Sequence, residues 1–268
     1  CLMKKVTNWK KGFEHILYTI APALSLVLLF LLWVQISRGN SDLVPGPDLV
    51  MKRFVKTFEK PINGYMIFGH ILASLKRIFL ALLFSLGIGI PFGILIGWNK
   101  TFNAIFGTLF EFIRPIPPIA WLPLIVMWFG IGEFPKVIIV FIGTFTPVVV
   151  NTATGIRLVE PLYLDVGRMF HANDRKLLTE IALPSAMQSI FAGFRTATSG
   201  GLMVVLAAEM IGAKAGLGFL ITRGQDAFDV PLIMVGMIVI AIVGTVISIF
   251  TDLLERRICP WSENIKSD

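Results

Sequence analysis

The chain has 268 residues, of which 55% are hydrophobic and 15% are charged, with a mean hydropathy of +0.78. A soluble domain carries about 25% charged residues, so this composition excludes an ordinary globular protein and predicts a chain embedded in a bilayer. The net charge of +7 fits basic loops that orient a membrane protein, and no aromatic-interleaved basic stripe indicates nucleic acid. Two distant cysteines and three scattered histidines have no metal-ligand spacing, so no metal site is predicted.

Six segments are predicted to cross the membrane as helices, because a helix satisfies its own backbone groups in lipid. Four of them are uncharged and reach about 30 Å at 1.5 Å per residue. These four are residues 16–36, 78–98, 137–156 and 230–251. Residues 101–132 carry Glu111, Arg114 and four prolines, which predicts a short helix, a break at 114–118 and a second short helix. With residues 185–212 as the sixth span, the predicted fold is all-α and polytopic.

The connections predict an orientation. The outer loop, residues 37–69, contains a turn cluster at 44–47, followed by apolar residues at helical spacing between lysines. This predicts a short amphipathic helix packed on its own protein rather than on the membrane surface. The N-terminal lysines, Lys100, the loop 157–176 and the arginines 256–257 fall on one side of six spans, so both termini are expected in the cytoplasm. The first span is too long for a signal peptide and is expected to be retained.

Small residues recur four apart on two of the predicted spans, a spacing that lets helix backbones approach closely. The two ladders are Gly89, Gly93 and Gly97, and Gly193, Ala197 and Gly201. For each ladder, plain close packing is favoured over a moving seam.

Residues that are charged at membrane depth, or that let a helix bend, are candidates for a translocation path. They are Pro147, Arg195, Gly200, Gly201 and Glu209. Glu209 either lines a cavity or caps helix packing. Glu111 and Arg114 are three apart and are expected to pair, either along a path or at the cytoplasmic interface.

The hydrophilic stretch 157–185 separates two spans and carries the most specific pattern in the chain. Apolar residues alternate with charged ones in a way that suits short surface helices, and Pro184 restarts the chain into the next span. The pattern predicts a cytoplasmic hairpin of two short helices that docks on a partner.

This hairpin resembles the EAA motif of ABC importer permeases, which reads Glu-Ala-Ala, three residues, Gly, nine residues and Ile-x-Leu-Pro. Residues 181–184 match its end, residues 165–167 stand at Glu-Ala-Ala, and His171 stands at the glycine. That glycine lies in a turn and tolerates positive φ, which histidine adopts at a cost. The residues that the resemblance assigns to ATPase coupling are Asp165, Val166, Gly167, Arg168, His171, Ala172, Ile181, Leu183 and Pro184.

Four further stretches resemble the nitrate, sulfonate, taurine and bicarbonate branch of these permeases, and pyrimidine-precursor permeases of thiamine salvage look similar too. The stretches are residues 114–124, 128–132, 207–212 and 216–221. The resemblance covers roughly residues 65–258 and implies a type I importer fold of MetI-like arrangement. It also implies a small substrate, either a nitrate-, sulfonate- or taurine-like anion or a thiamine pyrimidine precursor.

The same resemblance implies partners in a bacterial inner membrane. Two copies of the chain would form the path as a homodimer, two cytoplasmic ATP-binding subunits would receive the hairpin, and an extracytoplasmic binding protein would deliver solute. The chain has no phosphate-binding loop, since residues 98–101 lack the glycine needed before the lysine. We therefore expect a transport subunit rather than an enzyme, with ATP and magnesium held by the partner ATPase and no cofactor on this chain.

The expected organisation has three parts. Residues 1–64 form an N-terminal transmembrane helix and outer loop, residues 65–258 form the permease core with the hairpin at 157–185, and residues 259–268 form a cytoplasmic tail. An ion-coupled secondary transporter is the main alternative, and it predicts paired buried carboxylates and internal repeats. A membrane enzyme would cluster histidines or acids near one interface, which this sequence does not do. A scaffold protein that only anchors a partner is a further alternative. Spans that are broken by prolines and packed through glycines, however, are better suited to a protein that moves.

Overall fold

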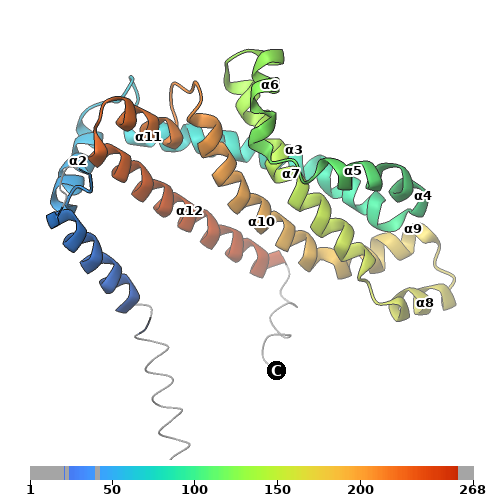
Figure 1. Ribbon diagram of the computed structural model, residues 1–268. Helices are drawn as coiled ribbons and strands as arrows, with labels where there is room; N and C mark the ends of the chain where they lie inside the picture. Colours follow the sequence, from blue (N-terminus) through green and yellow to red (C-terminus); the bar gives the residue numbers. More distant parts are fainter. Residues whose placement is uncertain (1–20, 22–23, 40–42, 259–268) are drawn as a thin grey trace, which may run out of the picture.

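The computed structural model describes residues 21, 24–39 and 43–258, and this part of the chain is built from helices without a strand (Figure 1). The long helices are α3 (Ile67–Trp98), α7 (Glu133–Arg157), α10 (Leu183–Glu209) and α12 (Val230–Ile258). The shorter helices are α2 (Pro47–Glu59), α4 (Lys100–Phe102), α5 (Thr108–Ile113), α6 (Leu122–Phe129), α8 (Pro161–Met169), α9 (Asp174–Lys176) and α11 (Leu217–Asp226). The segments Asn103–Gly107 and Leu177–Ala182 are π-helical, and Pro118–Trp121 is a 3-10 turn.

Four described helices are long and apolar enough to cross a membrane, and the number is five if a bent pair is counted as one span. The pair consists of Lys100–Ile113 and Pro118–Phe129, whose axes differ by 87°. The bend falls at the predicted break, residues 114–118, because prolines there cannot donate the backbone hydrogen bonds that a continuous helix needs. The all-α, membrane-spanning character predicted from the sequence is confirmed.

Two predicted spans differ from the structure at their ends. The first, residues 16–36, lies partly outside the described residues, and its described part belongs to the helix Leu24–Gly39. The second was predicted to begin at residue 78, but α3 begins at Ile67 and carries Arg77 inside the helix. The predicted span started after two adjacent cations because only uncharged residues were counted, yet Arg77 is only 4% exposed because carboxylates from other helices neutralise it.

The amphipathic helix expected in the outer loop is α2, and it packs on its own protein. Val50 is buried in an apolar cluster that includes Leu220 of α11 and Val235 of α12. Arg53 Nε donates to Asp229 Oδ2 at 2.7 Å, which adds an ion pair between α2 and the start of α12. The structure thus agrees with the packed alternative for this helix.

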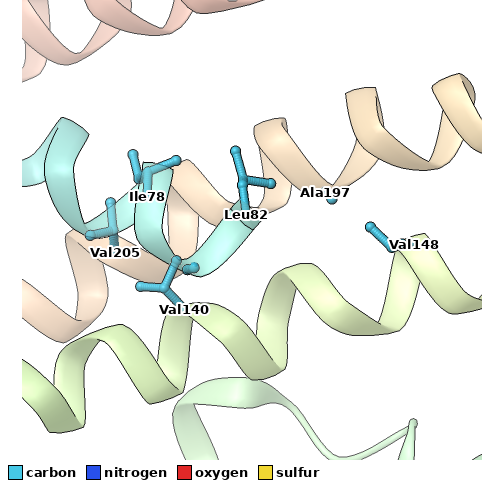
Figure 2. Close-up of a cluster of buried hydrophobic side chains, with 7 residues drawn as sticks. Ile78, Leu82, Val140, Val148, Ala197 and Val205 are labelled. Atoms are coloured by element: carbon cyan, nitrogen blue, oxygen red, sulfur yellow. The ribbon is translucent and has the colours of Figure 1, made fainter. Parts of the chain in front are cut away.

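Helix α7 lies between α3 and α10 at the centre of the bundle. Helix α3 runs parallel to α7, and α10 runs antiparallel to it, so the two neighbours of α7 run in opposite directions. The shared apolar core draws on all three helices, and Figure 2 shows how its side chains converge. The core residues are Ile78, Ala81, Leu82, Val140, Val148, Ala197 and Val205.

The glycine ladder of α3 faces α7. A Cβ atom at Gly93 would lie 2.7 Å from Thr152 Cβ and 2.9 Å from the Val149 carbonyl oxygen. One turn further on, a Cβ at Gly97 would lie 2.8 Å from Ile156 Cβ. The missing side chains, including that of Gly89 one turn earlier, therefore let the two backbones approach in a way that a larger residue forbids.

The second ladder, on α10, faces the other side of α7. A Cβ at Gly201 would lie 2.7 Å from Thr144 Cγ2, and one at Gly193 would lie 2.7 Å from Asn151 Cβ. Ala197, between these two glycines, is fully buried. Close packing on both sides fixes α7 between its neighbours.

Charged residues on the long helices gather at two levels. On α7, no charged residue lies between Lys136 and Arg157, a run of about 30 Å at 1.5 Å per residue. On α12, the uncharged run extends from Val230 to Asp252, about 33 Å along the helix. These lengths match the hydrocarbon thickness of a bilayer. The end of the bundle that carries α8 and α9 is the hairpin end, and the other is the opposite end.

Candidate functional site

The hairpin is held in shape by close packing between α8 and the π-helical segment that follows it. Gly167 is buried on this inner side of α8. A Cβ there would lie 2.5 Å from Leu177 Cδ2 and 2.7 Å from Ile181 Cδ1, so a larger residue would displace these two side chains. Gly167 therefore lets the two arms pack closely.

The turn between the arms is closed by a histidine in a left-handed conformation. His171 has φ of 57°, the region that glycine occupies most easily. Its backbone N–H donates to the Arg168 carbonyl at 2.9 Å, and the next N–H, of Ala172, donates to the Gly167 carbonyl at 3.1 Å. Asn173 Oδ1 then accepts the Lys176 N–H at 2.9 Å and caps α9. The turn forms without a glycine at position 171.

The outer side of the hairpin is exposed and partly apolar. Met169 and Phe170 are 78% and 81% exposed, and Tyr163 is 52% exposed. Asp165 and Arg168 form an exposed ion pair at 2.9 Å. Large apolar side chains grouped on an exposed tip are typical of a surface that binds another protein.

The base of the hairpin belongs to the bundle. Leu177 is 1% exposed and Ala182 is fully buried. Ala182 joins a cluster with Ile156 of α7 and Ile190 of α10, against which Leu183 packs. The hairpin is thus attached to two long helices through side-chain packing.

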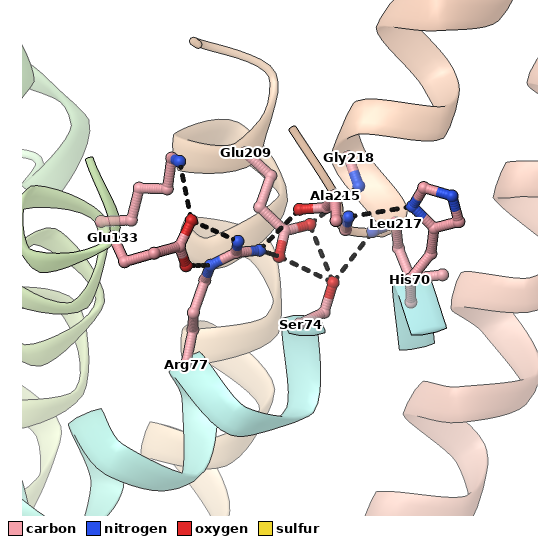
Figure 3. Close-up of polar contacts among 10 residues, drawn as sticks. His70, Ser74, Arg77, Glu133, Glu209, Ala215, Leu217 and Gly218 are labelled. Carbon is pink, nitrogen blue, oxygen red and sulfur yellow. Dashed lines mark hydrogen bonds and ion pairs between the residues drawn. The ribbon is translucent and has the colours of Figure 1, made fainter. Parts of the chain in front are cut away.

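A second polar site lies at the opposite end and joins three helices around one buried arginine (Figure 3). Arg77 Nη1 of α3 donates to Glu209 Oε1 of α10 at 2.5 Å. Its Nε and Nη2 donate to the two oxygens of Glu133, the first residue of α7, at 2.6 and 2.8 Å. Lys136 Nζ adds a bond to Glu133 at 3.2 Å. These residues, together with His70, Ser74 and the loop 216–218, are called the Arg77 cluster.

The Glu209 carboxylate is fully buried and surrounded by donors. Ser74 Oγ lies 2.7 and 2.8 Å from its two oxygens, and the Gly218 N–H donates to Oε2 at 2.9 Å. Gly216 has φ of 140°, and a Cβ on it would overlap the carboxylate. Glycine is therefore required where the chain passes Glu209, both for its backbone conformation and for space.

His70 of α3 binds the same loop, which leads into α11. Its Nδ1 accepts the Gly216 N–H at 3.1 Å, which leaves Nε2 to donate to the Ile62 carbonyl at 3.1 Å. Ser74 Oγ accepts the Leu217 N–H at 2.9 Å. The start of α11 is thus tied to α3, and its buried backbone donors are satisfied.

The charged path candidates occupy different places. Glu209 has no exposed surface, and its place on a translocation path remains a prediction. Arg195 lies toward the hairpin end, where it pairs with Asp252 Oδ1 at 3.2 Å and with Glu255, both on α12. Arg195 therefore links α10 to α12 and does not meet Glu209.

The other path candidates are helix residues with different surroundings. Pro147 lies inside α7, where its carbonyl accepts Asn151 Nδ2 at 2.8 Å. Gly201 packs against Thr144, whereas a Cβ on Gly200 would meet nothing within 4 Å. A role for these residues in bending remains a prediction.

Sequence reasoning missed most of the Arg77 cluster. His70, Ser74 and Arg77 fall between the predicted outer loop, residues 37–69, and the predicted span that begins at residue 78, and Glu133 was not singled out. One signal was present, because two glycines at 216 and 218 follow Glu209 closely in the sequence. No sequence pattern shows that these glycines pack on a carboxylate.

Comparison with known proteins decides the family. Residues 89–262 match the family model described as the binding-protein-dependent transport system inner membrane component. The chain belongs to this family. Among the similar relatives of this permease is a putative ABC transporter permease protein of Methanocaldococcus jannaschii, 32% identical over 97% of this chain and 99% of the relative. The taurine transport system permease protein TauC of Escherichia coli is 33% identical, covering 83% of this chain and 82% of TauC. The putative aliphatic sulfonates transport permease protein SsuC of Bacillus subtilis is 30% identical, covering 96% and 90%.

Solved structures share the permease fold. Inward-facing MetNI, a methionine ABC transporter, matches with a TM-score of 0.63 and 16% identity, over 69% of this chain and 93% of that chain. An amino acid ABC transporter with histidines matches with a TM-score of 0.62 and 20% identity, over 78% and 97%. The predicted MetI-like fold is confirmed. So is the prediction that this chain is a permease subunit of a binding-protein-dependent ABC importer.

Proposed function

We propose that the hairpin formed by α8 and α9 is the element through which a partner ATPase drives transport, and that two copies of this permease form the path above two ATPase subunits. The exposed apolar tip carries this proposal. Met169 and Phe170 project beyond the apolar part of the bundle, where water would otherwise surround them. A cleft on a partner subunit would cover these side chains.

The hairpin is built to pass a movement into the membrane. From α9 onward, Asp174–Glu209 form one 36-residue span that leads from the hairpin to the Arg77 cluster. At 1.5 Å per residue this span is about 54 Å long, enough to cross the bilayer and project beyond it. Because packed helices move as rigid bodies, a push on the hairpin would shift the opposite end of α10 relative to α3 and α7.

The hairpin end would face the cytoplasm, with both termini on that side of a bacterial inner membrane. Support comes from the cations gathered there, which include Arg157, Arg175, Lys176, Arg256 and Arg257. Short cytoplasmic loops carry such an excess of basic residues. ATP hydrolysis would then belong to the partner subunit, since the sequence has no phosphate-binding loop of its own.

The substrate proposed for this permease is a small anion with a sulfonate-type head group. Support comes from two relatives whose names specify taurine and aliphatic sulfonates. A binding protein at the opposite end would deliver the solute.

Co-purification with the partner ATPase tests the docking role. Phe170→Glu places a charge on the exposed tip, whereas Phe228→Glu places one at the opposite end, on a side chain that is 92% exposed. Both variants are expected to insert into the membrane. Phe170→Glu should lose at least tenfold of the co-purified ATPase, while Phe228→Glu should keep it. Equal recovery in both variants would overturn the docking role.

Sidedness has its own test. Met169→Cys, in a background with serine at Cys1 and Cys259, should react with an impermeant maleimide in inside-out vesicles. In right-side-out vesicles it should stay unlabelled. The reverse pattern would place the hairpin outside the cell and exclude a cytoplasmic ATPase as its partner.

A further inference from the structure

We infer that a polar cavity between the broken span and α7 binds the acidic head group of a small organic anion during transport. The cavity has a volume of about 500 Å3 and lies at the hairpin half of the bundle. Its polar lining residues are Asn103, Thr108, Glu111, Arg114, Thr154 and Arg157. This volume is in the range of small-molecule sites in proteins. The inference rests on the proposed function and adds a binding place for the solute.

The lining carries one uncompensated positive charge. Arg114 Nη1 is paired with Glu111 Oε1 at 2.9 Å, so these two charges cancel. Arg157 Nη2 donates to two neutral oxygens, Asn103 Oδ1 at 2.7 Å and the Ile96 carbonyl at 3.3 Å. Among the described residues, no carboxylate pairs with Arg157. A guanidinium whose remaining N–H groups are free is suited to a sulfonate or carboxylate, which it can bind through two hydrogen bonds.

The helix around Asn103 is shaped to hold Arg157. Asn103 opens a π-helical segment that ends at Gly107, and such segments are frequent at functional sites. Gly107 is buried, and a Cβ on it would overlap the Asn103 side-chain oxygen. Glycine here therefore makes room for the amide that fixes the Arg157 guanidinium, so the cavity lining is positioned before any ligand arrives.

A second cavity adjoins the first and suits the organic part of the anion. Its volume is about 340 Å3, and the two cavities share Phe110 and Arg114. Aromatic rings line much of it, among them Phe92, Trp121 and Phe145. The two cavities meet at Phe110 and Arg114, whereas Arg157 lines only the polar one. An apolar space that adjoins the polar cavity favours an organosulfonate over inorganic sulfate, because sulfate has no apolar part to bury.

A charge-sensitive labelling experiment tests the inference. Thr154 lies one helical turn before Arg157 on the cavity wall, so Thr154→Cys reports on the site in a background with serine at Cys1 and Cys259. Inside-out vesicles are treated with anionic 2-sulfonatoethyl methanethiosulfonate or with its cationic trimethylammonium analogue. Relative to a free thiol, the anionic reagent should react about tenfold faster than the cationic one. Millimolar 2-hydroxyethanesulfonate should slow the labelling more than sulfate does.

Variants at Arg157 separate the charge from the fold. Arg157→Gln should abolish both the charge preference and the protection, whereas Arg157→Lys should keep the charge preference. Met169→Cys, outside the cavity, should show no dependence on Arg157. Equal rates for the two reagents at Thr154→Cys, or no protection by the sulfonate, would overturn the inference. Either result would leave the ATPase docking role standing if Phe170→Glu still loses the ATPase, so the two failures are distinguishable.

Discussion

Arg77 Nη1 and Glu209 Oε1 lie 2.5 Å apart, although 132 positions separate the two residues in the chain. Their side chains are 4% and 0% exposed, so the pair joins α3 to α10 out of contact with water. Nε and Nη2 of Arg77 donate to Glu133, which brings α7 to the same point. The relative positions of three helix ends thus depend on one guanidinium, and the same three ends must move if the bundle opens on this side.

Removing one member of this pair should destabilise the bundle strongly. Arg77→Met leaves Glu209 charged and buried without a counter-ion, which costs about 3–5 kcal/mol. The double variant Arg77→Met with Glu209→Met should recover much of that loss, since no buried charge then remains. Thermal unfolding in detergent measures the effect. Glu133→Gln is the control, because Glu133 is 66% exposed and should lower stability far less. A double variant as unstable as Arg77→Met would contradict this account.

The α3 ladder makes a prediction about a single methyl group. Gly93→Ala places a Cβ 2.7 Å from Thr152 Cβ, so α3 and α7 must separate, at a cost of about 1–3 kcal/mol. Gly87→Ala is the matched control on the same helix, since a Cβ there meets nothing within 4 Å. Alanine is the better helix former, so Gly87→Ala should be neutral or stabilising by up to about 1 kcal/mol. Melting temperatures in detergent should therefore fall for one variant only, and equal shifts would argue against the close approach.

The positive φ of His171 predicts that glycine stabilises the hairpin turn and that a β-branched residue destabilises it. His171→Gly should relieve the cost of positive φ, about 1 kcal/mol, and leave ATPase co-purification intact. His171→Val should distort the turn, because a β-branched residue at this φ is strained. Hydrogen exchange of the hairpin amides measures the difference, with slower exchange expected for glycine and faster exchange for valine. Faster exchange in the glycine variant would show that the histidine side chain itself stabilises the turn.

Spacing within the hairpin should control coupling. Gly167→Leu inserts a side chain where a Cβ alone would lie 2.5 Å from Leu177 Cδ2, so the arms should part and uptake should become uncoupled from ATP hydrolysis. Asp165→Asn removes only an exposed ion pair, which contributes less than about 1 kcal/mol to stability. Its thermal stability should stay unchanged, and any loss of uptake would then report on contact with the ATPase. Normal coupled uptake in both variants, measured in proteoliposomes, would count against the docking role.

Local features of the sequence were enough for most of the described spans, the break and the hairpin. A run of apolar residues long enough for a bilayer needs no tertiary information, and prolines at 114–118 interrupt a helix whatever surrounds it. The hairpin followed from charge alternation and from Ile181, Leu183 and Pro184, which lie close together in the chain. The glycine ladders were visible as spacings, but their partner helix was not.

Only the tertiary structure decided which distant groups meet. Arg77 was left outside the predicted span because a lone cation is unfavourable inside a membrane helix, and two carboxylates from other helices remove that penalty. Both ladders face α7, which no count of four-residue spacings can show. The charge left over at Arg157 likewise depends on which side chains fold around it. Sequence determined the elements because hydrophobicity and backbone chemistry act within a segment, whereas contacts between segments exist only once the chain has packed.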